Sequence, residues 1–537
     1  MFTRPLHEIR QLFLEKKTSY VATYLLALLG ALGGVPNQVE HEAHLFLASH
    51  YASHFFSLWD PRWYGGFWVT GHPPLVHEWV ALMSGIPGMG LERAYAILTV
   101  IAALLWIFSC QQLLLVMNGR HNTTDGTILI ALNPLLYFFL FPLGQLPFLL
   151  GITLGILASV CVWQFYKHKD PVILSIGFLL IISAMTAHPL GFLGTLPGLT
   201  IYLISSARMS QKIYIILGGL VATAVAAAVL LPFLQWIVAK HTRVLPLAKF
   251  SLTNLHPTAV MSVIATCVLL VMTIMGERNR RTVVFMLLSV IFIAACTVNF
   301  RFISEDKLLF LALTSALFSY ACGLSVPEIV QKNVICGTCI VGFFLTATVL
   351  SHREGITTRH YREATRELIK FFNQEEYAGF RYLTLGLGNE RLELSRHGVV
   401  ETIDGGMPWL RVASGLEATP FYSYDDLPLD DPLARHVLKN ILQQSDTLGL
   451  RFVVNLKEQA VPFLESAGFR MRNAWKGGVV VWERINLPQK VKNDVPLAEP
   501  IWRLLWGFLP LLFCSFGLVG YGLWLRFSVT MAAKKSV

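Results

Sequence analysis

The sequence has 537 residues, of which 54% are hydrophobic and only 14% are charged. Soluble domains carry about 25% charged residues, so this composition excludes a purely soluble enzyme, a disordered chain and a collagen-like protein. We assign the formal net charge of +10 to membrane topology and not to nucleic-acid binding, because cytoplasmic loops of membrane proteins collect Lys and Arg.

Apolar stretches of the length that crosses a bilayer, about 20 residues, recur along the chain. We predict about twelve transmembrane spans, at 19–35, 92–117, 127–142, 145–166, 171–187, 190–206, 212–238, 258–275, 282–299, 307–323, 333–350 and 501–525. Basic residues precede the first span and concentrate in the loops on the same side. This distribution predicts a multi-pass α-helical protein with both termini in the cytoplasm.

The first outer loop, residues 36–91, begins with a run of acidic residues and histidines. Glu40 follows the first span, and on a helix it would share a face with His44. Ionisable residues near membrane depth are costly and are therefore functional candidates. A metal site and a helix on the membrane surface are two further interpretations. The metal site would use His41, His44, His50 and His54, and the surface helix would place Leu45, Phe46, Phe55 and Phe56 in lipid. We assign no metal ligand, because no H-E-x-x-H pattern is present.

Two turns rich in proline and aromatic residues follow in this loop. The sequence W-D-P-R-W-Y-G-G-F covers 59–67, and its Asp60 could bind a metal, orient an acceptor or form an Asx turn before Pro61. The segment Gly71-His72-Pro73-Pro74-Leu75 predicts a rigid entry to a short re-entrant or interfacial helix.

The predicted orientation divides the chain into three parts. Residues 1–350 form a transmembrane module, 351–500 an extracytoplasmic mixed α/β domain, and 501–537 the last transmembrane helix and a cytoplasmic tail. Apolar spacing in the outer domain predicts helices at 361–373 and 459–468 and strands at 380–386, 451–456 and 478–484. The acidic run Asp425, Asp426, Asp430 and Asp431 lacks the EF-hand pattern, so we expect a solvated loop there.

The first-loop motifs together resemble those of the GT-C glycosyltransferase superfamily, closest to the membrane proteins labelled "6-pyruvoyl-tetrahydropterin synthase-related". Members of that group usually show Asp-x-x-x-His, then W-N/D-P-x-x-x-G-G-x-P, then Y-P-P. Here Glu40 stands where Asp is usual, Trp68 where Pro is common, and His72 replaces the aromatic residue before the two prolines.

The resemblance implies an inverting glycosyltransferase of the bacterial inner (plasma) membrane. It would move a sugar from a polyprenyl-phosphate donor to an extracytoplasmic glycan, lipid or protein acceptor. Glu40 would be the general base, with Glu42 as its substitute, and His44 and Asp60 would support it.

Cations on the outer side would hold the phosphate of the lipid donor, because charge develops on its oxygens as the sugar leaves. The candidates are Lys240, Arg243, Lys249, Arg301 and Lys307. Arg243 and Arg301 are favoured because arginine makes bidentate contacts, and ordinary snorkelling at the interface is the alternative. Arg62 and His72 are further substrate-binding candidates, and His188 either faces the cleft or is a buried, satisfied histidine.

A non-enzymatic scaffold or transporter in envelope glycan or lipid assembly is the rival interpretation. Transporters often carry charged pairs inside their helices, whereas the middle of these spans is almost free of charge, which favours the enzyme. The expected partners are membrane lipid, the lipid-linked donor, the acceptor and envelope-assembly proteins. No cofactor is assigned, and a divalent cation (Mg²⁺, Mn²⁺ or Ca²⁺) stays open.

Overall fold

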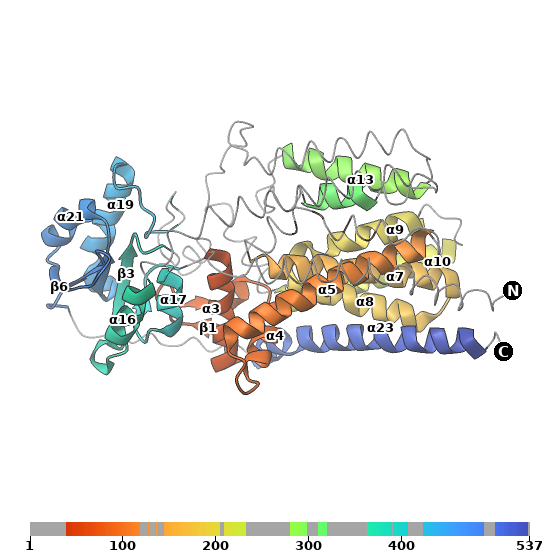
Figure 1. Cartoon of the computed structure of the whole chain (residues 1–537), viewed down its shortest axis with the longest axis horizontal. Helices are drawn as coiled ribbons and strands as arrows, with labels where there is room; N and C mark the ends of the chain where they lie inside the picture. The colour runs from red at the N-terminus through yellow and green to blue at the C-terminus, as the bar shows by residue number, and fades with distance from the viewer. Residues whose placement is uncertain are drawn as a thin grey trace.

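Long helices and a small sheet occupy opposite ends of the protein (Figure 1). The computed structural model describes residues 39–118, 127, 130, 133, 136, 144–203, 209–231, 280–297, 310–318, 362–388, 390–405, 421, 423–487 and 500–534. The elements of the first outer loop lie between the helical bundle and the sheet domain (Figure 1).

The bundle is built from apolar helices. They are α5 (Leu91–Asn118), α7 (Leu146–His168), α8 (Pro171–Ala187), α9 (Leu196–Leu203), α10 (Met209–Val229), α13 (Arg280–Thr297), α22 (Pro500–Gly507) and α23 (Leu509–Lys534). Helix α7 is the centre of the bundle, since every residue from Leu146 to Trp163 is buried. Within the described ranges, four helical stretches are long and apolar enough to cross a membrane: Leu91–Met117, Leu146–His168, Lys212–Val229 and Ile501–Ser528. The chain is therefore a membrane protein.

The predicted number of twelve spans is not confirmed. The spans at 19–35, 258–275 and 333–350 lie outside the described residues. The span predicted at 190–206 is not one continuous α-helix, because a 3-10 segment, η3 (Pro189–Thr195), precedes the short α9. Segment η3 lies against α7 so closely that a Cβ on Gly155 would come within 2.4 Å of the Gly191 carbonyl oxygen.

The first outer loop folds into α3 (Val39–His54), the hairpin β1 (Trp59–Asp60) and β2 (Phe67–Trp68), the 3-10 turn η1 (Val69–Gly71) and α4 (Leu75–Ser84). Leu45 and Phe46 are fully buried, and the Phe46 ring stacks on Trp63 with 3.7 Å between centroids. The alternative interpretation that places these two residues of α3 in lipid is therefore wrong for both, because the hairpin and its neighbours cover them. Phe56, just after the helix, is exposed.

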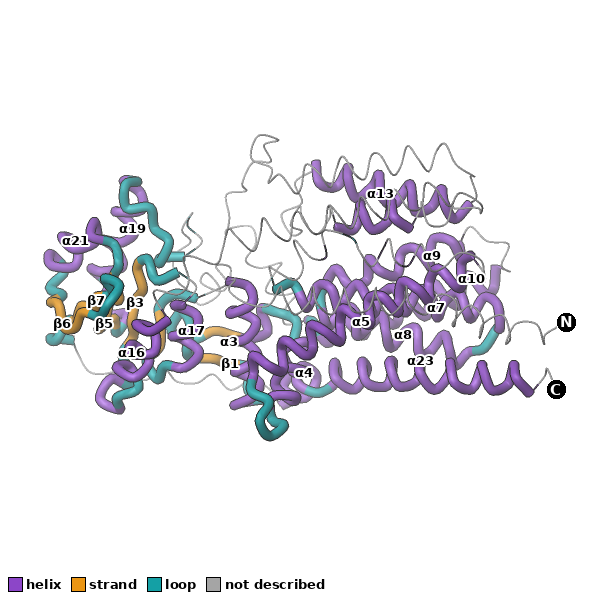
Figure 2. The backbone as a smooth tube through the Cα atoms, viewed as in Figure 1, coloured by secondary structure: helices purple, strands orange, loops and turns teal. Residues whose placement is uncertain are grey.

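The domain predicted to lie on the outer side, called the outer domain below, contains a five-stranded mixed sheet. Its order is β4-β3-β5-β7-β6, formed by β3 (Arg381–Leu385), β4 (Glu401–Thr402), β5 (Leu450–Asn455), β6 (Arg470–Ala474) and β7 (Val480–Glu483). Strand β3 pairs parallel with β4 and β5, and β7 pairs antiparallel with β5 and β6. Among the described elements, strands occur only here and in the first-loop hairpin (Figure 2).

Helices flank this sheet: α16 (Arg362–Phe372), α17 (Glu390–His397), α19 (Pro432–Gln443), α20 (Ser445–Leu448) and α21 (Val461–Ser466). The predicted helix at 361–373 and the three predicted strands are confirmed as α16, β3, β5 and β7. The expectation of a solvated acidic loop is wrong for Asp425, which is fully buried. Its carboxylate accepts hydrogen bonds from the backbone N–H groups of Leu387 and Gly388.

The outer domain packs directly on the first loop. Trp63 is fully buried, and its indole Nε1 donates to Ser395 Oγ on α17 at 2.8 Å. The Thr402 N–H of β4 donates to the Arg62 carbonyl at 2.9 Å. These contacts join two segments that lie more than 300 residues apart in the sequence.

Candidate functional site at the first outer loop

The structure accounts for some of the predicted site residues and leaves others undescribed. Glu40 lies in the first turn of α3, and its side chain is outside the described part. The predicted phosphate-binding cations are outside it as well: Lys240, Arg243, Lys249, Arg301 and Lys307. Geometry is therefore available for Glu42, His44, Asp60, Arg62, His72 and His188.

Glu42 faces an arginine of the outer domain. The Arg396 Nη2 of α17 lies 3.8 Å from Glu42 Oε2 and donates to Glu92 Oε1 at 2.7 Å. The Arg396 side chain is 4% exposed, and its Nε and Nη1 make no hydrogen bond to any described residue. A buried guanidinium thus stands beside the acidic first turns of α3. Sequence reasoning missed Arg396, because nothing in its local sequence separates it from an ordinary helical surface residue.

His41 lies in the same region. Burial and the nearby Arg396 charge together lower the pKa of His41 to about 4, against a smaller opposing effect of Glu92. The ring of His41 is therefore neutral at pH 7 and packs edge-on against Tyr95, with 4.6 Å between centroids.

Asp60 is fully buried at the base of the hairpin. Its Oδ1 accepts from the Arg62 backbone N–H at 2.9 Å, which is the predicted Asx turn, and also from Arg62 Nε at 3.0 Å. Its Oδ2 accepts from Arg62 Nη2 at 2.6 Å and from His50 Nδ1 at 3.0 Å. Burial alone would raise the pKa of Asp60, but the Arg62 charge and the hydrogen bonds from His50 and Arg62 outweigh it and hold the pKa well below its ordinary value.

Arg62 is engaged in the same network. Besides Asp60, it bonds the Ser49 hydroxyl at 2.8 Å, and its guanidinium lies 4.1 Å from the centre of the Phe46 ring. These contacts fix the hairpin to α3. The structure thus gives Asp60 and Arg62 a positioning role, and their predicted parts in catalysis and substrate binding stay predictions.

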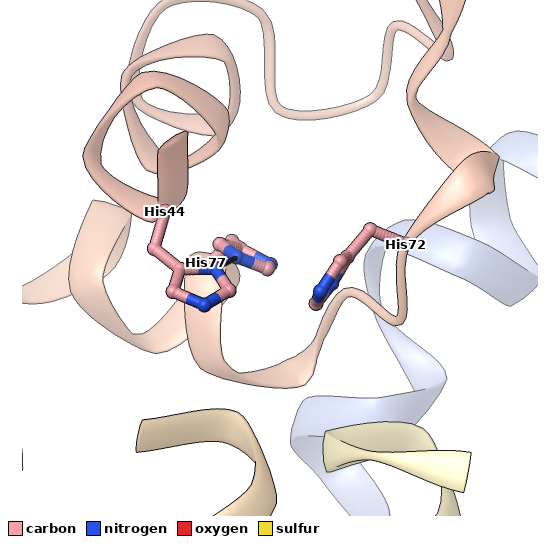
Figure 3. Close-up of side chains that lie close together, drawn as sticks. All are labelled: His44, His72 and His77. Carbon is pink, nitrogen blue, oxygen red and sulfur yellow. Dashed lines mark hydrogen bonds between the residues drawn. The ribbon is translucent and has the colours of Figure 1, made fainter. Parts of the chain in front are cut away.

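Three histidines of the first loop converge (Figure 3). His44 of α3, His72 after η1 and His77 of α4 bring one ring nitrogen each within 4.8 Å of one another. The metal-ligand set considered from the sequence shared only His44 with this cluster. Sequence reasoning missed His77, because only the packing of α3 against α4 brings it beside His44.

Glu78 follows His77 on α4 and is fully buried. Burial raises the pKa of Glu78 well above its ordinary value, and neither carboxyl oxygen has a hydrogen-bond partner in the described part of the chain. Glu78 is thus a second ionisable group of α4 that the sequence did not single out.

His188 belongs to the bundle. Its Nδ1 accepts from the Leu190 N–H at 3.1 Å and so caps η3, and its ring lies edge-on to Phe148. A cavity of about 30 Å³ also lies in the bundle, lined by Leu113, Phe285 and Phe318 among others. No titratable side chain lines it, so the first loop remains the candidate site.

The sequence matches no known family and no curated protein. Among solved structures, the arabinofuranosyltransferase AftD from Mycobacteria is similar over 88% of this chain and 40% of its own, with a TM-score of 0.57 and 12% identity. Two solved structures are less similar. An oligosaccharyltransferase from Archaeoglobus fulgidus has a TM-score of 0.48 and 12% identity over 86% of this chain and 73% of its own. ArnT from Cupriavidus metallidurans has a TM-score of 0.40 and 10% identity over 88% of this chain and 98% of its own.

The likeness to AftD shows that this chain shares the fold of that arabinofuranosyltransferase, which agrees with the predicted fold class. The chain spans about 40% of the AftD chain. Membership of the pterin-synthase-related group stays a prediction.

Proposed function

We propose that this protein is a GT-C membrane glycosyltransferase that moves a sugar from a polyprenyl-phosphate donor to a glycan, lipid or protein on the outer side of the inner membrane. The observation that carries the proposal is the meeting of the acidic first turns of α3 with the buried guanidinium of Arg396. The AftD fold supports the same class of protein.

The chemistry of sugar transfer requires a base on one side of the anomeric carbon and a stabilised anion on the other. The acceptor hydroxyl oxygen forms the new bond to the anomeric carbon, and the bond from that carbon to the phosphate oxygen breaks with its electron pair. Glu40 takes the acceptor proton, with Glu42 as its substitute. The leaving polyprenyl phosphate carries the negative charge away.

Arg396 is the cation that the described part of the chain offers for this phosphate. A guanidinium presents several N–H donors in a fixed plane, which suits the oxygens of a phosphate group. Two of the Arg396 nitrogens have no hydrogen-bond partner in the described region, and unsatisfied donors on a buried charge favour binding of an anion. His44 and Asp60 hold α3 and the hairpin in place around the two acidic residues.

The test is sugar transfer in proteoliposomes. The purified protein is given a panel of labelled polyprenyl-phosphate sugars, beginning with arabinofuranose, together with membrane glycan and lipid acceptors. Glu40→Gln keeps the shape of the side chain but removes the base, so turnover falls by about 100-fold or more. Glu363→Gln, on the exposed face of α16, is the matched control and leaves turnover unchanged.

The variants also separate the alternatives. If Glu42 is the base, Glu42→Gln shows the large loss and Glu40→Gln the small one. Arg396→Gln raises the KM for the donor more than it lowers kcat, if Arg396 holds the phosphate. Absence of transfer from every donor, or full activity of both Gln variants, would refute the proposal and favour the scaffold or transporter.

A further inference from the structure

The three histidines of the first loop come from three separate elements and present their rings to one another (Figure 3). His44 lies in the second turn of α3, His72 ends η1, and His77 lies in the first turn of α4. His44 and His77 are buried, with 5% and 1% of their surface exposed, and His72 is half-buried. One nitrogen from each ring lies within 4.8 Å of the other two.

The Pro73 carbonyl fixes the tautomers of two of these rings. His72 Nδ1 lies 3.2 Å and His77 Nδ1 3.1 Å from this oxygen. A carbonyl oxygen can only accept, so each Nδ1 carries the proton and each Nε2 carries the lone pair. Metal-ligating histidines usually show this arrangement, in which the distal N–H donates to a backbone carbonyl and orients the ring.

We propose that His44, His72 and His77 bind one divalent transition-metal ion, with Zn²⁺ the best suited. Neutral imidazole is a preferred ligand of Zn²⁺, and three histidines form a known ligand set for this ion. His77 supplies Nε2, which faces His44 Nδ1 at 3.0 Å.

One nitrogen separation already matches such an ion, and the third ring lies within 4.8 Å. Two nitrogens at about 2.0–2.1 Å from a tetrahedral Zn²⁺ lie roughly 3.3 Å apart, and the separation between His44 and His77 is 3.0 Å. Without an ion, the proton of His44 Nδ1 fills this gap as a hydrogen bond. With an ion, His44 changes tautomer: the proton leaves Nδ1 and Nε2 of the same ring takes up a proton, so that the lone pairs of His44 Nδ1 and His77 Nε2 both point to the metal.

Two other histidines of α3 make contacts elsewhere. His50 contacts Asp60 with one ring nitrogen and the Ser57 carbonyl with the other. His41 packs on Tyr95. In the described residues, His44, His72 and His77 form the only group of three potential ligands of this kind.

A bound ion would cross-link α3 to α4 through His44 and His77, one turn after the acidic start of α3. Three protein ligands leave the fourth tetrahedral position to water or to an oxyanion, which is the pattern of an open zinc site. The inference rests on the histidine geometry alone and stands whether or not the protein transfers sugars.

The test is metal binding by purified protein that carries no polyhistidine tag. The protein is stripped with a chelator and titrated with Zn²⁺ against a chromophoric competitor, and with Co²⁺ to record its visible spectrum. We expect one equivalent of Zn²⁺ and the intense Co²⁺ bands of a four-coordinate site. His72→Ala weakens Zn²⁺ binding by roughly 100-fold or more, since changes outside the ligand shell alone cost 10–100-fold. His436→Ala, at an exposed histidine of α19, is the control and binds as the unchanged protein does.

His44→Ala and His77→Ala remove buried rings and would also disturb packing, so the half-buried His72 is the decisive position. Elution volume and circular dichroism check that the His72→Ala protein is folded. X-ray absorption of the Zn²⁺-loaded, unsubstituted protein adds a measurement that needs no variant, and we expect nitrogen neighbours at about 2.0–2.1 Å. Failure to bind Zn²⁺ at micromolar concentration, or unchanged binding by a folded His72→Ala protein, would overturn the proposal. Sulfur neighbours at about 2.3 Å would overturn it as well, since they indicate a cysteine site.

Discussion

The buried carboxylate of Asp60 gives the sharpest prediction about the first outer loop. In Asp60→Asn the amide keeps one acceptor oxygen, which can still bond the Arg62 backbone. Its NH₂ group then replaces Oδ2 and faces Arg62 Nη2 and His50 Nδ1, which are both donors. Two charge-assisted hydrogen bonds are lost, each worth about 1.5 kcal/mol at the lower end of the range. The hairpin should therefore be destabilised by about 3 kcal/mol, which agrees with the cost of breaking a buried ion pair.

Hydrogen exchange measures this loss locally, which suits a membrane protein whose global unfolding is seldom two-state. A change of about 3 kcal/mol in the opening free energy raises exchange of the β1–β2 amides by about 100-fold. The matched control is Asp446→Asn, because Asp446 pairs with Arg484 at an exposed position and surface pairs contribute about 0–1 kcal/mol. If the hairpin amides of Asp60→Asn exchange within about three-fold of the unchanged protein, the network does not stabilise the loop as argued.

The same carboxylate predicts the acid response of the loop. The pKa of folded Asp60 lies below its ordinary value, so its contribution to stability is complete above the ordinary value of about 4 and disappears as the pH falls through the folded pKa. Hairpin protection, corrected for intrinsic exchange rates, should stay constant from pH 7 to pH 5 and weaken only in stronger acid. In Asp60→Asn this acid-dependent step should be absent. Loss of protection already between pH 7 and pH 5 in the unchanged protein would contradict the assignment.

Two further predictions concern the bundle and the outer domain. Gly155→Ala forces a methyl group against the Gly191 carbonyl and should destabilise the purified protein by about 1–3 kcal/mol in thermal unfolding. Gly219→Ala on α10 is the control and should be neutral, because a Cβ there meets nothing within 4 Å. Equal effects of the two changes would contradict the packing of η3 on α7. Arg396→Met removes the ion pair with Glu92. Hydrogen exchange of the α17 amides should increase by only about 3–10-fold, because the exposed Glu92 stays solvated after the change. Unfolding of the whole outer domain would contradict this expectation and would show that Arg396 has a larger structural role.

Sequence alone predicts the elements whose signals are local. Helix α8 has the predicted bounds, since Asp170 caps it by accepting from the Val172 N–H and Pro171 occupies its first position. Strands β3, β5 and β7 were found because their apolar runs are buried. Strand β6 was missed because all five of its side chains are exposed, so no alternation or apolar run marks it.

The candidate site was predicted only in part, because its contacts join distant segments. Spacing along one helix suggested His44 with His41, His50 and His54, but the packing of α4 on α3 brings His72 and His77 to His44 instead. No periodicity in either segment encodes that packing. The Asx turn at Asp60 was predictable, since it needs only residues 60 to 62. The bonds from His50 and from the Arg62 guanidinium to the same carboxylate were not.

The contacts of the outer domain make the site a composite of two distant segments. Trp63 of the hairpin has no exposed surface, because Phe46 covers one side of its ring and Ser395 bonds its indole N–H. Arg396, the next residue of α17, reaches the acidic turns of α3 from the same helix. A displacement of α17 would therefore move the buried guanidinium away from Glu42 and expose the Trp63 ring in one step. The charge balance at the start of α3 is thus tied to the docking of a domain more than 300 residues away in the sequence.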